Sequence, residues 1–186
     1  MTDRYTLIPD RSRFAVQAFA GGMLSGFAHN PVFAVRSYTG DIRFDSDGLN
    51  LWCQIAVQAD SLQITGSPKD SDREEITRAM FEEVLEIKRF PQILFASTAS
   101  TVTKIADNWF RAQVKGDMQI HGMTKPQSID FQVRVSDEGL RLSGEFPLSL
   151  TTYKMKRVSA LGGMIQLKDE LKFSFDLVAQ KQASSK

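Results

Sequence analysis

The chain has 186 residues and nearly balanced charges, with 23 Lys and Arg against 22 Asp and Glu and a formal net charge of +1. This balance argues against nucleic acid and against an acidic surface as partners. The sequence has no run of about 18 apolar residues, so no transmembrane helix is expected. The length predicts a single domain over residues 1–180 with a core of its own, followed by a polar tail over 181–186.

Cysteine content and the N-terminal sequence bear on the cellular compartment. Cys53 is the only cysteine, which excludes an internal disulfide. The alternation of apolar residues around it predicts that its side chain faces the interior as a small hydrophobe. Residues 1–5 lack the basic and apolar regions of a signal peptide. The sequence as written therefore predicts a cytoplasmic protein, or a periplasmic one if a leader peptide has been removed.

In chain order, the first predicted strands lead into a segment with two interpretations. Alternating apolar residues predict a short strand over 5–8 and a longer one over 13–19. Residues 19–30 alternate poorly and contain three glycines, which weaken a helix. Within this segment a spacing of four residues, which is typical of a helix, separates Phe19, Met23 and Phe27. The segment is either a short lid-like helical turn or loop over one end of the strands, or a bulged continuation of the preceding strand.

Strand alternation resumes over 32–45 and 49–59, and a helical pattern then follows. Residues 71–74 read Ser-Asp-Arg-Glu, which is the capping-box form of a helix start. Apolar residues at helical spacing continue until Phe90-Pro91, where the proline disfavours helix before it. We therefore predict one main helix over about 71–88.

The longest alternation in the chain lies over residues 109–135. Every second residue from Phe110 to Ile120 is apolar or glycine, and the residues between them are polar. A break over 121–125 precedes a second strand of the same kind over 129–135. Two long one-sided strands joined by a short glycine-containing turn predict an antiparallel hairpin.

Three more strands complete the predicted fold. They begin near Ile93, Leu140 and Leu171, and a basic, irregular stretch over 151–163 separates the last two. Counted from Arg13, eight long strands have one apolar face each, and one helix cannot cover that much sheet. The strands must cover one another, as a sandwich or a barrel. Their near-sequential order favours a mostly β fold, an eight-stranded antiparallel up-and-down barrel.

Four segments of the chain read like the signatures of a known family. Residues 90–98 read F-P-Q-I-L-F-A-S-T, residues 116–126 read G-D-M-Q-I-H-G-M-T-K-P, residues 40–45 read G-D-I-R-F-D, and Ser61 precedes Leu62. In order and spacing they resemble Y-P-x-I-x-F-x-S-T, G-x-L-T-I-H-G-V-T-K-P, G-x-I-x-F-D and the start of S-L-x-T-G. These are signatures of the YceI-like family of polyisoprenoid-binding, lipocalin-like proteins.

The resemblance implies a lipocalin-like barrel around a tunnel that holds a long isoprenoid chain. A polyprenyl quinone, a polyprenyl alcohol or a polyprenyl phosphate would be such a ligand. The resemblance also implies a homodimer. No cofactor other than a bound isoprenoid lipid and no metal is expected.

Along each strand, every second side chain is expected to face the interior of the barrel. These side chains are the ones that we expect to line the tunnel and contact the ligand. These are Phe14, Val16, Ile42, Phe44, Ile55, Ile93, Phe95, Phe110, Val114, Met118, Ile120, Phe131, Val133, Leu142, Phe146, Phe173 and Phe175. Candidates for contact with a head group at the tunnel mouth are Phe19, Met23, Phe27 and His29. The alternative, from the residues alone, is that the inward side chains simply fill the barrel as a core.

The polar residues do not form a pattern typical of catalysis. His29 and His121 are the only histidines and have no metal-ligand spacing, and His121 is expected to bond backbone at the hairpin turn. Lys154, Lys156 and Arg157 indicate a solvated face, with contact to a phosphate or a membrane surface as the alternative. No nucleophile elbow and no glycine-rich phosphate loop is present.

The sequence therefore favours a lipid-binding protein that is not an enzyme, with an isoprenoid or fatty amphiphile as its partner. Binding would serve transport, storage or sequestration. One alternative is a barrel enzyme that acts on an apolar substrate, such as an isomerase or cyclase, which would need a titratable group in the lumen. The other is a stress-response or interaction module with a solid core.

Overall fold

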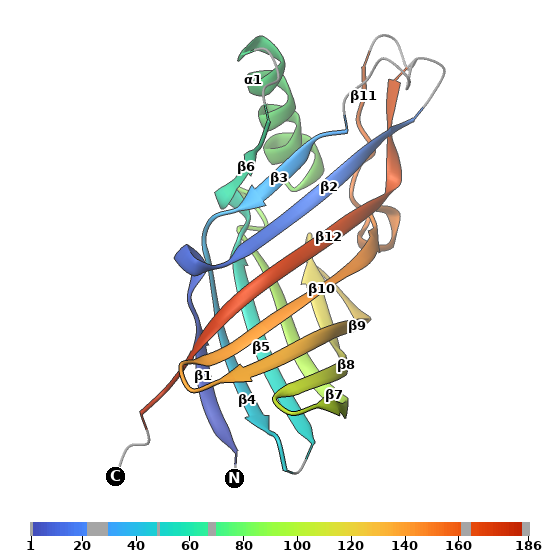
Figure 1. Ribbon diagram of the computed structural model, residues 1–186. Helices are drawn as coiled ribbons and strands as arrows, with labels where there is room; N and C mark the ends of the chain where they lie inside the picture. The colour runs from blue at the N-terminus through green and yellow to red at the C-terminus, as the bar shows by residue number, and fades with distance from the viewer. Residues whose placement is uncertain (1, 22–29, 48, 67–69, 161–164, 184–186) are drawn as a thin grey trace.

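The computed structural model describes residues 2–21, 30–47, 49–66, 70–160 and 165–183. Strands make up most of it, and one helical segment lies at the end that we call the upper end (Figure 1). The first strand begins at the opposite, lower end. The predicted mostly β fold is confirmed.

The strands are β1 (Asp3–Leu7), β2 (Arg13–Gly21), β3 (Val32–Val35), β4 (Tyr38–Asp45), β5 (Asn50–Gln58), β6 (Leu62–Ile64), β7 (Gln92–Ala106), β8 (Trp109–Ile120), β9 (Met123–Ser136), β10 (Gly139–Ser149), β11 (Ser159–Ala160) and β12 (Ile165–Lys181). The helical elements are α1 (Asp70–Ala79), the π-helical turn η4 (Met80–Val84) and the 3-10 turns η1 (Pro9–Arg11), η3 (Ala59–Ser61) and η5 (Thr151–Tyr153).

Eight strands close into an antiparallel barrel in the order β1, β4, β5, β7, β8, β9, β10 and β12, with β12 returning to β1. The circuit keeps the order of these strands along the chain, and β2, β3, β6 and β11 lie outside it. The predicted up-and-down barrel is therefore confirmed, with one difference. The short strand β1 belongs to the wall, because β1 and β2 pair with successive parts of the same long strand, β12.

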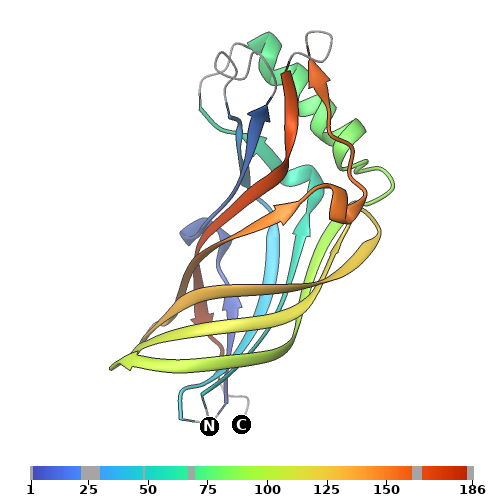
Figure 2. The same cartoon turned by 90° about the vertical axis from the view of Figure 1, so that its right-hand side faces the viewer.

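Three wall strands are each broken into a lower and an upper piece. The lower pieces β1, β4 and β5 pair with one another, and the upper pieces β2, β3 and β6 form a separate ladder. At the upper end this ladder is joined to β12 through β2, and the helical segment lies at the same end of the barrel (Figure 2). The breaks allow the upper wall to diverge from the lower one.

The predicted hairpin over 109–135 is present as β8 and β9, which pair from Trp109 opposite Arg134 to Ile120 opposite Met123. Its turn is shorter than predicted. His121 and Gly122 alone form it, with φ of 51° and 70°. Positive φ at both positions is typical of the type I′ turn, whose twist matches that of two paired strands. Met123 therefore already belongs to β9.

The predicted helix is present but begins and ends earlier than residues 71–88. Asp70 is its first residue, so Ser71 lies inside the first turn and is not its N-cap. The helix continues through the π turn to Val84, where the Leu85 amide donates to the Met80 carbonyl at 2.9 Å. Glu86 then adopts a positive φ of 47°, a conformation that ends helices.

Other boundaries also differ from the predicted ones. Strand β2 continues to Gly21, so the interpretation of 19–30 as a strand continuation holds for its first residues, and residues 22–29 lie outside the described part. The predicted irregular stretch over 151–163 contains η5 and β11. Strand β12 reaches Lys181, which pairs with Tyr5, so the ordered barrel includes the first residue of the predicted tail.

The hairpin turn yields a stability prediction. A Cβ on Gly122 would lie 2.7 Å from the Phe90 ring, whereas a Cβ on Gly66, at φ 86°, would meet no described atom within 4 Å. Left-handed backbone costs alanine about 1–2 kcal/mol, so both Gly→Ala variants lose stability. We expect Gly122→Ala to lose roughly 1 kcal/mol more, because its methyl group also displaces the ring. Urea unfolding measures the difference, and equal losses would contradict it.

Candidate functional site

The upper half of the barrel encloses a cavity of about 820 Å³. Its walls are the inward faces of the strands, and α1 with η4 forms one side. Most side chains around it are apolar. Its volume lies within the range of about 300–1,000 Å³ that is typical of small-molecule sites.

Most of the predicted tunnel residues surround this cavity. They are Phe14, Val16, Ile42, Ile55, Ile93, Phe95, Met118, Ile120, Phe131, Leu142, Phe146, Phe173 and Phe175. They come from strands on all sides of the barrel, as the alternation predicts. That these residues contact a ligand stays a prediction.

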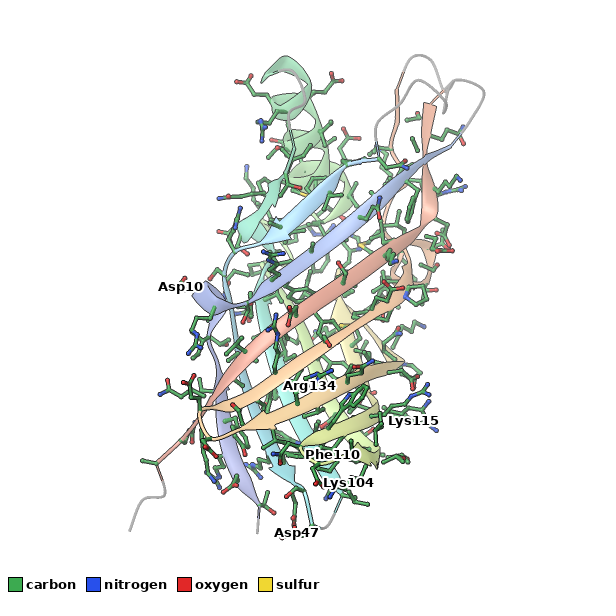
Figure 3. The ribbon with its side chains drawn as sticks, viewed as in Figure 1. Asp10, Asp47, Lys104, Phe110, Lys115 and Arg134 are labelled. Atoms are coloured by element: carbon green, nitrogen blue, oxygen red, sulfur yellow. The ribbon has the colours of Figure 1, made fainter. Side chains whose placement is uncertain are left out.

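Four predicted tunnel residues do not reach the cavity, because they lie below it. Phe44, Phe110, Val114 and Val133 are each at most 4% exposed and belong to the packed core. The rings of Phe44 and Phe110 meet edge to face, with 5.2 Å between their centroids. Figure 3 places Phe110 in the lower barrel, while Lys115 of the same strand projects outward. The barrel is thus solid at its lower end and hollow at its upper end.

The cavity has further lining residues that the sequence analysis missed. Inward positions of the broken strands contribute Ala18, Ala20, Phe33, Val35, Val57 and Leu62, and Pro31 contributes from just before β3. The helical wall contributes Ile76, Ala79, Met80, Val84 and Leu85. Other wall residues are Ile129, Leu148, Leu150, Met155, Val158, Leu167, Leu171 and Leu177. The strand parity and the helical stripe could have identified most of them, whereas no pattern marks Met155 or Val158.

The predicted head-group residues are mostly outside the described part of the chain. Met23, Phe27 and His29 belong to residues 22–29 and are not placed. Phe19 lies in β2 between Ala18 and Ala20, which both line the cavity. Because side chains alternate along a strand, Phe19 faces the other side, and it is absent from the cavity wall.

Cys53 lies in the cavity wall and is 5% exposed, so its inward position is confirmed. Burial raises the pKa of its thiol from 9.0 to about 12, although a hydrogen bond with Ser97 opposes the shift. The Ser97 hydroxyl also accepts a 2.9 Å hydrogen bond from the Cys53 amide. The thiol therefore stays neutral near pH 7 and offers the cavity a small apolar surface.

Polar side chains reach the cavity at its upper rim. Glu75, Arg78 and Glu83 come from the helical segment, and Ser159 and Gln166 come from β11 and β12. All five are exposed to solvent. The site thus combines an apolar interior with a polar, mixed-charge mouth.

Polar contacts at each end hold the helical wall in place. Near its start, the Arg73 guanidinium donates to the carbonyls of Ile64 at 2.9 Å and Gly66 at 3.1 Å. Near its end, the Lys156 ammonium lies 2.7 Å from the Glu83 carboxylate and lowers the pKa of that carboxyl. Lys156 is exposed, in keeping with the predicted solvated face, and its ion pair also joins η4 to the segment before β11.

His121 joins the hairpin turn to the end of the helical segment. Its Nε2 pairs with the Glu86 carboxylate, and its ring lies 4.5 Å from the ring of Phe90. The predicted backbone bond is replaced by this side-chain pair. Hydrogen bonds from Arg89 and His121 lower the pKa of Glu86. The arrangement is structural, and the residue lies apart from the cavity wall.

Two further classes of site receive no support from the described residues. Within the described ranges, no group of three His, Cys, Asp or Glu side chains could hold a metal ion. No helix in the described part is long and apolar enough to cross a membrane.

The raised pKa of Cys53 predicts slow alkylation. At pH 8 a shift from 9.0 to about 12 leaves roughly a thousandfold less thiolate, so iodoacetamide should label the folded protein roughly a thousandfold more slowly than the urea-unfolded protein. Intact-protein mass spectrometry gives both rates from the single cysteine. Similar rates in the two states would show that the thiol is exposed and ionisable.

The Glu83–Lys156 pair predicts a pH-dependent contribution to stability. Because the folded pKa of Glu83 is lowered, the pair stabilises the fold above the ordinary value of 4.5, and this contribution is lost as the pH falls through the folded pKa. We expect Lys156→Met to lower the Tm at neutral pH and to match the wild type at acid pH. Lys154→Met is the control, since the described residues offer Lys154 no ion-pair partner. A Tm difference independent of pH would contradict this role.

Comparisons with known proteins agree with the barrel. A family model described as the YceI-like domain matches residues 5–179. A UPF0312 protein of Pseudomonas putida (strain W619) is 31% identical over 100 residues, which cover 51% of this chain and 48% of that protein. The chain thus spans about half the length of this curated relative.

Solved structures share the architecture at low sequence identity. BcnA of Burkholderia cenocepacia is 15% identical with a TM-score of 0.69, over 94% of this chain and 99% of that one. A polyisoprenoid binding domain of Saccharophagus degradans, implicated in plant cell wall breakdown, is 10% identical with a TM-score of 0.62, over 96% and 98%. The Campylobacter jejuni YCEI protein is 13% identical with a TM-score of 0.59, over 81% and 84%. These structures show a common fold, and because the family model spans nearly the whole barrel, the chain belongs to the YceI-like domain family.

Proposed function

We propose that the protein binds a long-chain isoprenoid or a similar amphiphilic lipid in the upper cavity. The apolar tail enters first, and the head group stays at the polar rim. The observation that carries this proposal is the geometry of the cavity, which is large, lined by apolar side chains and bordered by charged residues at its mouth. A polyprenyl quinone, alcohol or phosphate has the matching division into a tail and a head.

The physical basis of binding is the removal of the tail from water. Each methylene transferred into an apolar lumen gains about 0.8 kcal/mol. A few isoprene units therefore outweigh one polar contact at the rim, whose charges remain hydrated. The affinity is expected to follow the length of the buried tail more closely than the chemistry of the head group.

The family and its fold support a lipid ligand. One protein of the same fold is described as a polyisoprenoid binding domain. In this chain the strands that form the barrel also supply an apolar cavity of sufficient size. Enclosing the tail would keep the lipid in solution, which suits transport, storage or sequestration.

The cavity favours binding over the two alternatives. An isomerase or cyclase needs an acid or base beside the enclosed substrate, whereas the charged lining residues Glu75, Arg78 and Glu83 lie on the exposed rim. Cys53 faces the interior, but its high pKa makes it a poor nucleophile. A solid-core module would have a filled lumen, and only the lower barrel has one.

A charge placed in the cavity tests the proposal. Phe131 is 8% exposed and lines the cavity, whereas its neighbour Gln132 is exposed on the outer face of β9. Phe131→Arg puts an unpaired charge against the apolar tail, at a cost of several kcal/mol. We expect it to reduce lipid uptake by at least about a hundredfold. Gln132→Arg adds the same charge outside and should leave uptake unchanged.

Uptake is measured by native mass spectrometry after incubation with geranylgeranyl phosphate, and circular dichroism checks that both variants fold. A lipid-sized adduct in the wild type that persists in folded Phe131→Arg would place the lipid outside the cavity. Wild-type protein that takes up no amphiphile would refute the proposed function.

A further inference from the structure

The cavity ends abruptly within the barrel. We call its lower boundary the floor. On three strands, one inward residue lines the cavity and the next inward residue lies below the floor. Ile42 of β4, Cys53 of β5 and Leu142 of β10 line the cavity. The next inward residues toward the lower end, which lie outside the lining, are Phe44, Leu51 and Leu140. The lining stops in this way on each of the three strands, and on the neighbours β4 and β5 it stops at the same rung of the ladder, which defines a closed lower end.

The floor is a thick plug of packed side chains. Phe44, Leu51, Val114, Val133 and Leu140 are each at most 2% exposed. The edge-to-face contact of Phe44 with Phe110 extends this packing toward the lower end. Because well-packed cores yield little to an inserted group, a tail cannot pass this layer at a small cost. A chain that enters from the polar rim must stop there.

The volume above the floor limits the length of the chain that can be buried. The space above the floor is finite, about 820 Å³, so only part of a long polyprenyl tail fits into it. A longer tail must leave its remaining units at the mouth. Those units are not removed from water by the barrel and add little to affinity.

We propose that this protein selects isoprenoid tails by length, with a limit on the number of buried units that is set by the floor, and that Phe44 and Cys53 determine this limit. The inference rests on the proposed function and specifies its ligand class. Phe44 is the aromatic side chain of the plug next to Ile42 on the same strand. Cys53 is a small residue in the wall at the same level, opposite Ile42 in the β4–β5 ladder.

A series of polyprenyl phosphates with two to eight isoprene units tests the limit on tail length. All members share one head group, so differences in affinity report the tail alone. Each lipid is titrated below its aggregation concentration, with intrinsic fluorescence and native mass spectrometry as readouts. For the wild type we expect affinity to rise by at least about tenfold per unit up to a break within the series, and by less than about threefold per unit beyond this break.

Two substitutions should shift, in opposite directions, the tail length at which affinity stops rising steeply. Phe44→Ala removes the ring from the plug and makes room for about one more isoprene unit, while Cys53→Phe fills space for about one unit. The break should therefore shift up by one unit in the first variant and down by one in the second. Trp52→Phe is the matched control, because Trp52 is next to Cys53 on β5 but faces outward beneath Arg43. It should leave the break in place.

The outcomes separate this inference from the proposed function. A wild-type affinity that rises evenly to eight units, or a break that neither variant moves, overturns the length limit and leaves lipid binding intact. Absence of binding at every length, or affinity independent of length, overturns both. If Phe44→Ala fails to fold, the wild-type break and the downward shift in Cys53→Phe still decide the question.

Discussion

The structure depends on one constraint, which is that the apolar face of a long antiparallel sheet must be covered. Its strands expose charged and polar side chains on one face and apolar ones on the other, as on β8, where buried and exposed residues alternate along its length. The single helical segment is too small to cover the apolar face. Closing the sheet on itself solves the problem, because each apolar row then faces another across the axis.

The same closure has different results at the two ends of the barrel. At the lower end, large side chains such as Phe44 and Phe110 are in contact, and the lumen is filled. At the upper end, β2, β3 and β6 leave the direction of the lower strands, and the wall is completed by α1 and η4. The side chains of the upper end do not fill its lumen, so an apolar cavity remains. The proposed lipid site follows from this difference in packing.

The sequence predicts the fold well because its signals are local and periodic. The parity from Phe110 to Ile120 predicts the β8–β9 hairpin, and most of the residues that the same parity assigns to the tunnel do surround the cavity. It cannot tell where the lumen stops. Ile42 and Phe44 share a strand and a parity, yet only Ile42 reaches the cavity, because that depends on the convergence of strands distant in sequence.

Contacts between distant segments also escape the sequence patterns. Lys156 pairs with Glu83 and His121 pairs with Glu86, and neither pair has a characteristic spacing. The early end of the helix has a similar cause, since the left-handed conformation of Glu86 accompanies its contacts with Arg89 and His121. Such contacts form after the barrel has placed its loops, so local propensity does not encode them.

The proposed apolar chain enters from the rim and ends at a closed floor. A crystal structure of the protein with an isoprenoid phosphate that has a bromine at the far end of its tail tests this arrangement. Anomalous scattering locates the bromine without assumptions about the rest of the ligand. We expect an anomalous peak at the floor beside Ile42 and Leu142, with the phosphate near the rim. A bromine at the rim, on the outer surface or within the lower barrel would contradict it.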